Sequence, residues 1–255
     1  MGCVTRCAYG RCLAASFHAG RKICQLHRKP ISSQEVTFHE SPEWEYAQLI
    51  TDVVLYDDWI LAFRATAHIN QSAYTTWITP GHYDDHPAIR HDVPIGCSSV
   101  NSSHFCDRHF RSKLIDKWNS FNIDQVKVVL YKNGVAVANL TFSGTGTSST
   151  SWFSQTKLIS SSWNDMSTST FNYFSMEGDA RLVRYWFISN VYGGCPHDVG
   201  WMVVLEKPTA PCDWEKAVTA GYPAFLYAPT NQKVVWDSNN VEEADVMAVF
   251  LKILP

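Results

Sequence analysis

The sequence predicts a mainly β protein, an antiparallel β-sandwich-like large domain with a small disulfide-stapled α+β piece at its N-terminus. Many short runs of β-branched and aromatic residues alternate with turn residues, and only two short stretches look helical. The cysteines and tryptophans also divide the chain into two parts. With 45% hydrophobic residues among 255, the chain can bury a core of domain size.

The N-terminal part is distinguished by its cysteines. The first 43 residues hold four of the eight cysteines and no tryptophan, whereas the remaining 212 residues hold all ten tryptophans. We therefore expect two units, residues 1–46, stapled by disulfides, and residues 47–255, stabilised by an aromatic-rich core. The opening residues lack the pattern of a signal peptide, so we expect the sequence to begin inside a longer protein.

Within the N-terminal part, Cys3 and Cys7 are spaced to share one face of a helical turn that ends near Gly10. Residues 13–17 and 23–26 then predict two short strands around a turn. The spacing Cys3, Cys7 and Cys12, followed by a strand with Phe17 and then by Cys24 and Leu26, resembles the PAN/apple family. Residues 43–46, Glu-Trp-Glu-Tyr, are similar to the closing strand of some invertebrate members.

The PAN/apple resemblance covers about a sixth of the chain. It implies the pairings Cys3–Cys24 and Cys7–Cys12, and a module that binds proteins or carbohydrates without catalysis. The first strand that family members carry before the helix is absent from this sequence. An unrelated four-cysteine hairpin is the alternative interpretation.

In the large unit, the clearest element is a hairpin over residues 124–142. Two β-branched runs flank Asn133-Gly134, a pair that suits a two-residue turn because both residues tolerate positive φ. Further strands are expected at residues 53–63, 74–78, 171–176, 182–189, 200–205, 224–227, 234–237 and 245–254. Helices are expected only at residues 111–119 and 214–219. The Ser/Thr-rich stretch 143–175 is interrupted by large apolar residues, which indicates an ordered excursion over the sheet.

The hairpin raises a conflict at Asn139. A regular two-residue turn would place Asn139 on the same face as Val126, Val128 and Leu130, where a glycan cannot enter the core. Either Asn139 lies beyond the covered part of that face, or the register is different, or the sequon is unused.

The remaining cysteines and the sequons indicate an extracellular protein. No C-x-x-C occurs, so we expect disulfides rather than a zinc cluster, with local staples Cys97–Cys106 and Cys195–Cys212; buried free thiols are the alternative. Asn70, Asn101 and Asn139 each begin an N-glycosylation sequon. Together these features predict secretion.

Charge and hydropathy exclude two classes of partner. A net charge of −3 without any basic run argues against nucleic acid. No apolar stretch reaches the length of about 18 residues that a membrane span needs. We therefore expect glycans or extracellular proteins as partners, or further copies of this chain in an assembly.

Two loops hold candidate ligand residues. On a strand, His82, Asp84 and His86 would share a face and could hold zinc, but flanking prolines favour a solvated loop and no cofactor. In the loop 193–201, His197 and Asp198 could bind sugar hydroxyls while Trp201 stacks on a sugar, or Asp198 could bind calcium. The alternative for this second loop is a disulfide-anchored turn with Trp201 in the core.

No enzymatic signature is found, because G-x-S-x-G, H-E-x-x-H, a phosphate-binding glycine loop and a dinucleotide fingerprint are all missing. Residues 163–165, 174–178 and 194–201 resemble stretches of invertebrate extracellular proteins of unassigned activity. Ten tryptophans exceed what a core of this size requires, so we expect two or three exposed as binding platforms. The sequence thus predicts a non-catalytic recognition or adhesion protein, or alternatively a structural subunit of an extracellular assembly.

Overall fold

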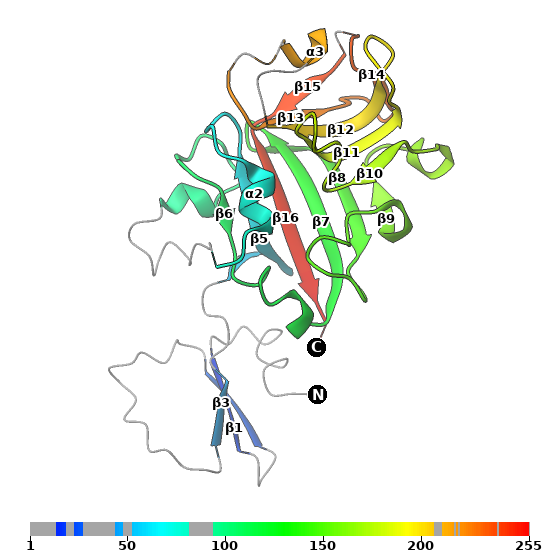
Figure 1. The fold of residues 1–255 in the computed structure, drawn as a ribbon. Coiled ribbons are helices and arrows are strands. Elements are labelled where there is room, and N and C mark those ends of the chain that lie inside the picture. The colour runs from blue at the N-terminus through cyan, green and yellow to red at the C-terminus, as the bar shows by residue number, and fades with distance from the viewer. Residues whose placement is uncertain are drawn as a thin grey trace. The chain divides into compact units, whose positions relative to one another are not determined.

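The structure is a computed structural model of the chain. It describes the backbone of three N-terminal strands, with bounds given below, and residues 53–81, 94–206, 211–216, 218, 220–238 and 240–254. The chain divides into two compact units, one of Met1–Val53 with Ile253–Pro255 and the other of Val54–Lys252. The described residues are mainly β, with two antiparallel sheets and few helices in the larger unit, as the sequence predicts (Figure 1).

In the smaller unit, the described residues form one antiparallel sheet with the strand order β2-β1-β3. Its strands are β1 (Ala14–His18), β2 (Ile23–His27) and β3 (Trp44–Ala47). The expected helix near residues 3–10 and the pairings Cys3–Cys24 and Cys7–Cys12 lie outside the described structure.

The first sheet of the larger unit has seven strands in the order β4-β5-β16-β7-β8-β9, and β6 also pairs with β5. Its long central strands run diagonally through Figure 1. The bounds are β4 (Val54–Tyr56), β5 (Trp59–Thr66), β6 (Phe110–Arg111), β7 (Ile123–Lys132), β8 (Val135–Ser143), β9 (Leu158–Ser161) and β16 (Val246–Ile253).

The second sheet has six strands in the order β10-β11-β12-β13-β15, and β14 also pairs with β12. Its strands are β10 (Tyr173–Ser175), β11 (Arg184–Val191), β12 (Val199–Leu205), β13 (Ala224–Tyr227), β14 (Val234–Val235) and β15 (Glu242–Ala244). Asp245 alone separates β15 from β16, so the chain passes directly from the second sheet into the centre of the first.

Aromatic side chains join the two sheets. Phe63 on β5 stacks on Trp186 of β11 with ring centroids 6.4 Å apart, and Phe142 on β8 meets the edge of Phe174 on β10 at 6.1 Å. Trp77, from the short helix α2 (Ala73–Ile78), packs edge-on against both Phe63 and Trp186. Edge-to-face and offset pairs of this kind add about 0.5–1.5 kcal/mol each beyond the burial of apolar area.

The outer face of the first sheet carries a second apolar cluster. Val54, Leu61, Val129 and Phe250 pack there against the disulfide Cys97–Cys106. The short 3-10 helix Ile95–Ser98 contains Cys97, and the disulfide closes the loop between Cys97 and Cys106 over this face of the sheet.

Residues 74–78 form helix α2, so the expected strand there is wrong. The Ser72 hydroxyl accepts a 2.9 Å hydrogen bond from the Thr75 N–H, which caps the helix N-terminus, and this cap outweighs the strand preference of two adjacent threonines. The second short helix is α3 (Asp213–Lys216), which overlaps the first part of the stretch 214–219 where the sequence predicts a helix.

The expected helix over residues 111–119 is also wrong. Backbone N–H groups of Ile115, Asp116 and Lys117 donate to carbonyls three residues back rather than four, which gives consecutive turns. The described residues hold three further 3-10 segments at Trp118–Ser120, Gln155–Lys157 and Met166–Thr168.

A β-bulge in the β7–β8 hairpin resolves the conflict at Asn139. Leu130 lies opposite Ala138, but Tyr131 lies opposite Ala136, so Val137 is an extra residue on β8. The extra residue turns Asn139 to the exposed face, while Ala138, Leu140 and Phe142 are buried.

Candidate functional site

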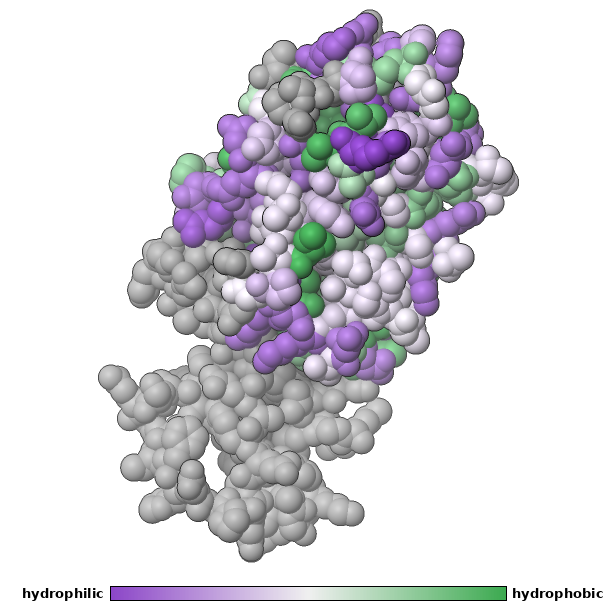
Figure 2. Space-filling view, in the orientation of Figure 1, coloured by the Kyte–Doolittle hydropathy of each residue, from purple (hydrophilic) through white to green (hydrophobic). Residues whose placement is uncertain are grey.

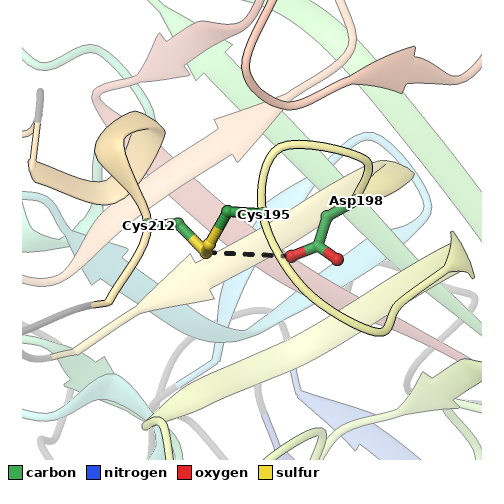
Figure 3. A group of neighbouring side chains, drawn as sticks. All are labelled: Cys195, Asp198 and Cys212. Carbon is green, nitrogen blue, oxygen red and sulfur yellow. Dashed lines mark hydrogen bonds between the residues drawn. A yellow bond between two sulfur atoms is a disulfide. The ribbon is translucent and has the colours of Figure 1, made fainter.

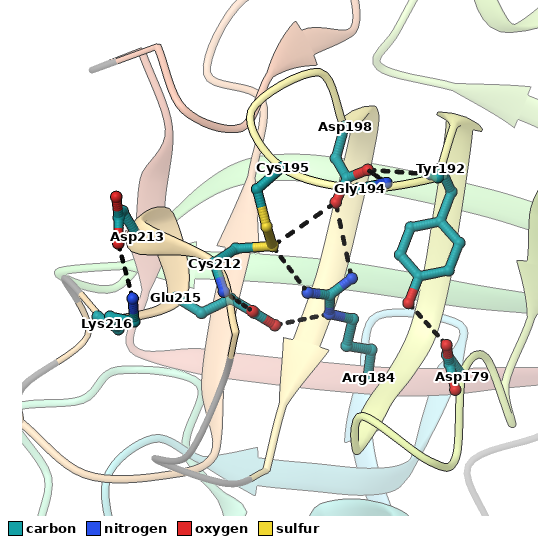
Figure 4. Close-up of a disulfide and its surroundings, with 11 residues drawn as sticks. Asp179, Arg184, Tyr192, Gly194, Cys195, Asp198, Cys212, Asp213, Glu215 and Lys216 are labelled. Carbon is teal, nitrogen blue, oxygen red and sulfur yellow. Dashed lines mark hydrogen bonds and ion pairs between the residues drawn. A yellow bond between two sulfur atoms is a disulfide. The ribbon is translucent and has the colours of Figure 1, made fainter.

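The loop 193–198 is held against β11 by a buried carboxylate. Asp198 is 1% exposed, and its Oδ1 accepts hydrogen bonds from the N–H groups of Gly193 and Gly194 at 3.2 and 3.1 Å. Its Oδ2 lies 3.7 Å from Nη1 of Arg184 on β11 (Figure 4). Because both oxygens have partners, Asp198 acts as the local anchor that the alternative interpretation of this loop describes.

Arg184 also binds a second buried carboxylate. Its Nε donates to Oε1 of Glu215 at 2.6 Å, and Oε2 of Glu215 accepts from the N–H of Cys212 at 3.1 Å. The guanidinium lies 4.9 Å from the ring centre of Trp214 and 5.1 Å from that of Tyr192. Burial alone would lower the pKa of Arg184, but the carboxylates of Glu215 and Asp198 raise it above its ordinary value.

The disulfide Cys195–Cys212 lies beside this charge cluster (Figure 3). Donor atoms of Cys195, Asp198 and Cys212 all lie within 4.8 Å of one another, a spacing that could hold a metal ion. The two sulfurs are bonded to each other, however, so neither offers a thiolate. Nη2 of Arg184 donates to the Cys212 sulfur at 3.3 Å, and the group therefore does not fit a cation.

The three residues expected to bind a ligand in this loop do not form a common surface. Trp201 is completely buried, donates from Nε1 to Oδ1 of Asp165 at 2.8 Å and packs on Phe171. Asp198 is buried as described, whereas His197 is exposed. The other expected ligands, His82, Asp84 and His86, lie outside the described residues.

The described tryptophans are almost all core residues, and the face of the larger unit seen in Figure 2 is mostly hydrophilic or intermediate in hydropathy, with scattered hydrophobic spots. Among the nine whose side chains are described, eight are buried, and only Trp59 is half-buried. The Lys127 ammonium group covers the Trp59 ring at 4.0 Å from its centre. A tryptophan platform for stacking a sugar is therefore not found in the described part of the chain.

The three sequon asparagines lie at accessible positions. Asn70 and Asn139 are exposed, and Asn70 has a positive φ of 55° in its turn. Asn101 is half-buried, and its side-chain oxygen accepts a 3.0 Å hydrogen bond from the Ser103 N–H.

A cavity of about 500 Å³, which we call the polar groove, lies between two turns of the larger unit. Its described lining holds amides, hydroxyls, glycines and aromatic rings, and no charged residue. The lining residues are Trp118, Asn119, Phe121, Asn122, Ile123, Gly144, Gly146, Thr147, Ser148 and Ser151.

Partly buried hydrogen bonds hold the two sides of the polar groove together. Nε1 of Trp118 donates to the Thr147 hydroxyl at 3.3 Å, and that hydroxyl donates to the Gly144 carbonyl at 2.6 Å. A Cβ at Gly144 would lie 2.5 Å from a methyl carbon of Ile123, so only glycine allows the two turns to approach this closely. Asn119 and Asn122 remain exposed at the rim.

A second cavity of about 410 Å³, the acidic groove, lies on the second sheet beside α3. Trp214 and Trp236 stack in its wall with ring centroids 5.4 Å apart. The complete described lining is Asp213, Trp214, Val218, Leu226, Trp236, Asp237, Ser238, Val241, Glu242 and Glu243.

Sequence reasoning missed both grooves. Each is lined by separate segments that carry no motif, and only the Ser/Thr content of residues 143–175 pointed toward the polar groove. Searches against family models, curated proteins and solved structures find no match to this chain. Among the described residues, no helix has the length and apolar character to cross a membrane.

Proposed function

We propose that this chain is a secreted, non-catalytic recognition protein whose larger unit, a sandwich-like pair of sheets, binds uncharged glycans in the polar groove. One observation carries the proposal, namely that the described lining of this groove combines exposed amides and hydroxyls with the half-buried ring of Phe121 and includes no charge. Sugar hydroxyls are recognised by such donors and acceptors, while the apolar C–H faces of a sugar pack on aromatic rings.

The extracellular location rests on separate support. The disulfides Cys97–Cys106 and Cys195–Cys212 are typical of an oxidising compartment. The accessible positions of Asn70, Asn101 and Asn139 fit N-linked glycans, and the PAN/apple-like spacing at the N-terminus fits a binding module. Mass spectrometry of the secreted chain before and after enzymatic deglycosylation tests these positions.

A glycan array with the full chain tests the proposed ligand class. We expect binding to uncharged glycans, and we expect Asn122→Ala to weaken it about 10-fold, because one lost amide contact is worth about 1–1.5 kcal/mol. Asn231→Ala removes an exposed amide outside the groove and serves as the matched control. An array without binding above background, or equal losses in the two variants, would refute the proposal.

A second function, a structural subunit of an extracellular assembly, has one observation in its favour. Ile95 and Phe105 flank the disulfide Cys97–Cys106 and are 79% and 73% exposed. Large apolar side chains on a rigid loop are typical of contacts between subunits. Size-exclusion chromatography and electron microscopy at native salt should then show large particles that Phe105→Ser disrupts, whereas a monomer at high concentration would exclude this function.

A further inference from the structure

The acidic groove concentrates negative charge. Four carboxylates line it, from Asp213 on α3, Asp237 after β14, and Glu242 and Glu243 on β15, and no described lining residue is basic. Hydrogen bonds from Lys132 and Tyr227 lower the pKa of Glu242, and a hydrogen bond from Lys216 lowers that of Asp213. Both carboxylates therefore stay ionised at neutral pH.

The remaining lining of the acidic groove is mostly apolar. Trp214 and Trp236 stack side by side, Leu226 is almost fully buried beside them, and Val218 and Val241 are half-buried. A ligand in this groove thus meets hydrocarbon along its floor and carboxylates around its rim. This combination matches a side chain that has an aliphatic stem and a cationic end.

Ion pairs already present leave the groove acidic. Lys216 and Lys132 form ion pairs with Asp213 and Glu242, and Nε2 of His68 forms a hydrogen bond with Glu243, but none of these three residues lines the cavity. Asp237 lines the groove, is half-buried, and forms no ion pair with any described residue. The charge facing the cavity is therefore complementary to a cation.

We propose that the acidic groove binds an arginine or lysine side chain of a partner protein. The aliphatic stem lies on Leu226 and the two valines, and the charged end lies among the carboxylates, with Asp237 as its principal partner. Arginine suits the rim better than lysine because its planar guanidinium can bind two carboxylates at once. The groove is separate from the polar groove, since the two share no lining residue.

NMR titration of the full chain tests this proposal. The probe is the blocked peptide Gly-Gly-Arg-Gly-Gly, and its matched control replaces arginine with the uncharged citrulline. We expect the arginine peptide to shift the indole N–H resonances of Trp214 and Trp236, with weaker binding at higher salt. The citrulline peptide should bind at least about 3-fold more weakly, as expected for one partly exposed charge interaction.

Two substitutions test whether the arginine peptide binds at the acidic groove. Asp237→Asn removes one groove charge and should weaken binding of the arginine peptide about 3-fold or more. Glu177→Gln removes the same charge from an exposed site outside the groove and should leave binding unchanged. Equal losses in both variants, equal binding of both peptides, or no shift at the highest soluble concentration would overturn the proposal.

A neutral sugar supplies the remaining comparison. Methyl glucoside should leave the Trp214 and Trp236 resonances unchanged; if it shifts them more than the arginine peptide does, the groove belongs to a glycan and the proposal is wrong. Failure of glycan binding at the polar groove is measured at Asn119 and Asn122, so the two proposals stand or fall separately.

Discussion

Arg184 Nε and Glu215 Oε1 form a 2.6 Å hydrogen bond between two side chains that are at most 1% exposed. Arg184 comes from β11, whereas Glu215 belongs to α3 and lies three residues after the disulfide-bonded Cys212. Asp198 faces the same guanidinium from the loop before β12. One buried cation therefore links β11 of the second sheet to helix α3 and to the loop before β12.

Arg184→Met should destabilise the larger unit by about 3–5 kcal/mol, because it leaves two buried carboxylates without their cation. Chemical denaturation followed by tryptophan fluorescence measures this loss. The control is Lys216→Gln, which removes a lysine of α3, the helix that carries Glu215. Lys216 forms only an exposed ion pair with Asp213, so its loss should change the free energy of unfolding little. A loss for Arg184→Met no larger than that of the control would show that the cluster contributes no stability.

Glu206 is a buried carboxyl that should make stability depend on pH. It accepts hydrogen bonds from the Ser72 hydroxyl and from the Tyr74 N–H, and burial raises its pKa to about 7 from the usual 4.5. In the unfolded chain this group ionises near its usual pKa, whereas in the folded chain it stays protonated up to about 7. Protonated Glu206 therefore stabilises the folded chain fully at pH values below the pKa of the unfolded state. This contribution to the free energy of unfolding is lost as the pH rises through the pKa of the folded state.

As the pH rises from the unfolded pKa of 4.5 to the folded pKa of about 7, the free energy of unfolding of the wild type should fall by on the order of 3 kcal/mol. The free energy of unfolding of Glu206→Gln should not show this decrease. Glutamine keeps a side-chain acceptor and does not ionise. Urea denaturation at successive pH values measures the difference, and the exposed Glu177→Gln serves as control. The same pH slope in wild type and Glu206→Gln would contradict the assigned pKa.

The disulfide Cys97–Cys106 should contribute measurably to stability. It closes a loop with a sequence separation of 9 residues, and both sulfurs lie in the apolar cluster with Leu61 and Phe250. The double variant Cys97→Ala and Cys106→Ala should lose about 2–4 kcal/mol from chain entropy and from packing. A thermal midpoint unchanged from that of the wild type would mean that the cluster alone holds this loop.

Local signals in the sequence predicted most of the strands. Residues 224–227 form β13 with the expected bounds, and Asn133-Gly134 forms the expected turn, with φ of 52° and 76°. The bulge at Val137 was not predictable, because it depends on the packing of Leu140 and Phe142 across the sheet. Helix α2 has a local cap in Ser72, but the N–H of Tyr74 in its first turn also donates to Glu206, which lies 132 residues later in the chain and gives no local signal.

The candidate sites were harder to predict than the fold. Residues 193–201 carry chemically versatile side chains, but whether Asp198 faces a ligand or the protein depends on Arg184 in another strand. Trp201 likewise looks the same in sequence whether it is core or platform, and its burial depends on Phe171 and Asp165. The grooves depend on surfaces that several segments form together, which no local pattern encodes.

Gly200 of β12 allows Trp236 to pack against the second sheet. A Cβ at this position would lie 2.6 Å from the Ile188 carbonyl oxygen and 2.9 Å from Cζ2 of Trp236, and neither neighbour is the end of a flexible side chain. Gly200→Ala should therefore cost about 1–3 kcal/mol, as overpacking does in a dense core. It should also shift the indole resonances of Trp236 and Trp214, since the two rings stack.

Gly193→Ala is the matched control for Gly200→Ala. A Cβ at Gly193 would meet no atom within 4 Å, so the same added methyl group should cost little there. The N–H of Gly193 that binds Asp198 is retained in this variant. Denaturation of both variants separates steric crowding at β12 from a general effect of replacing glycine: equal losses would mean that the contact between Gly200 and Trp236 does not limit the packing of the sheet.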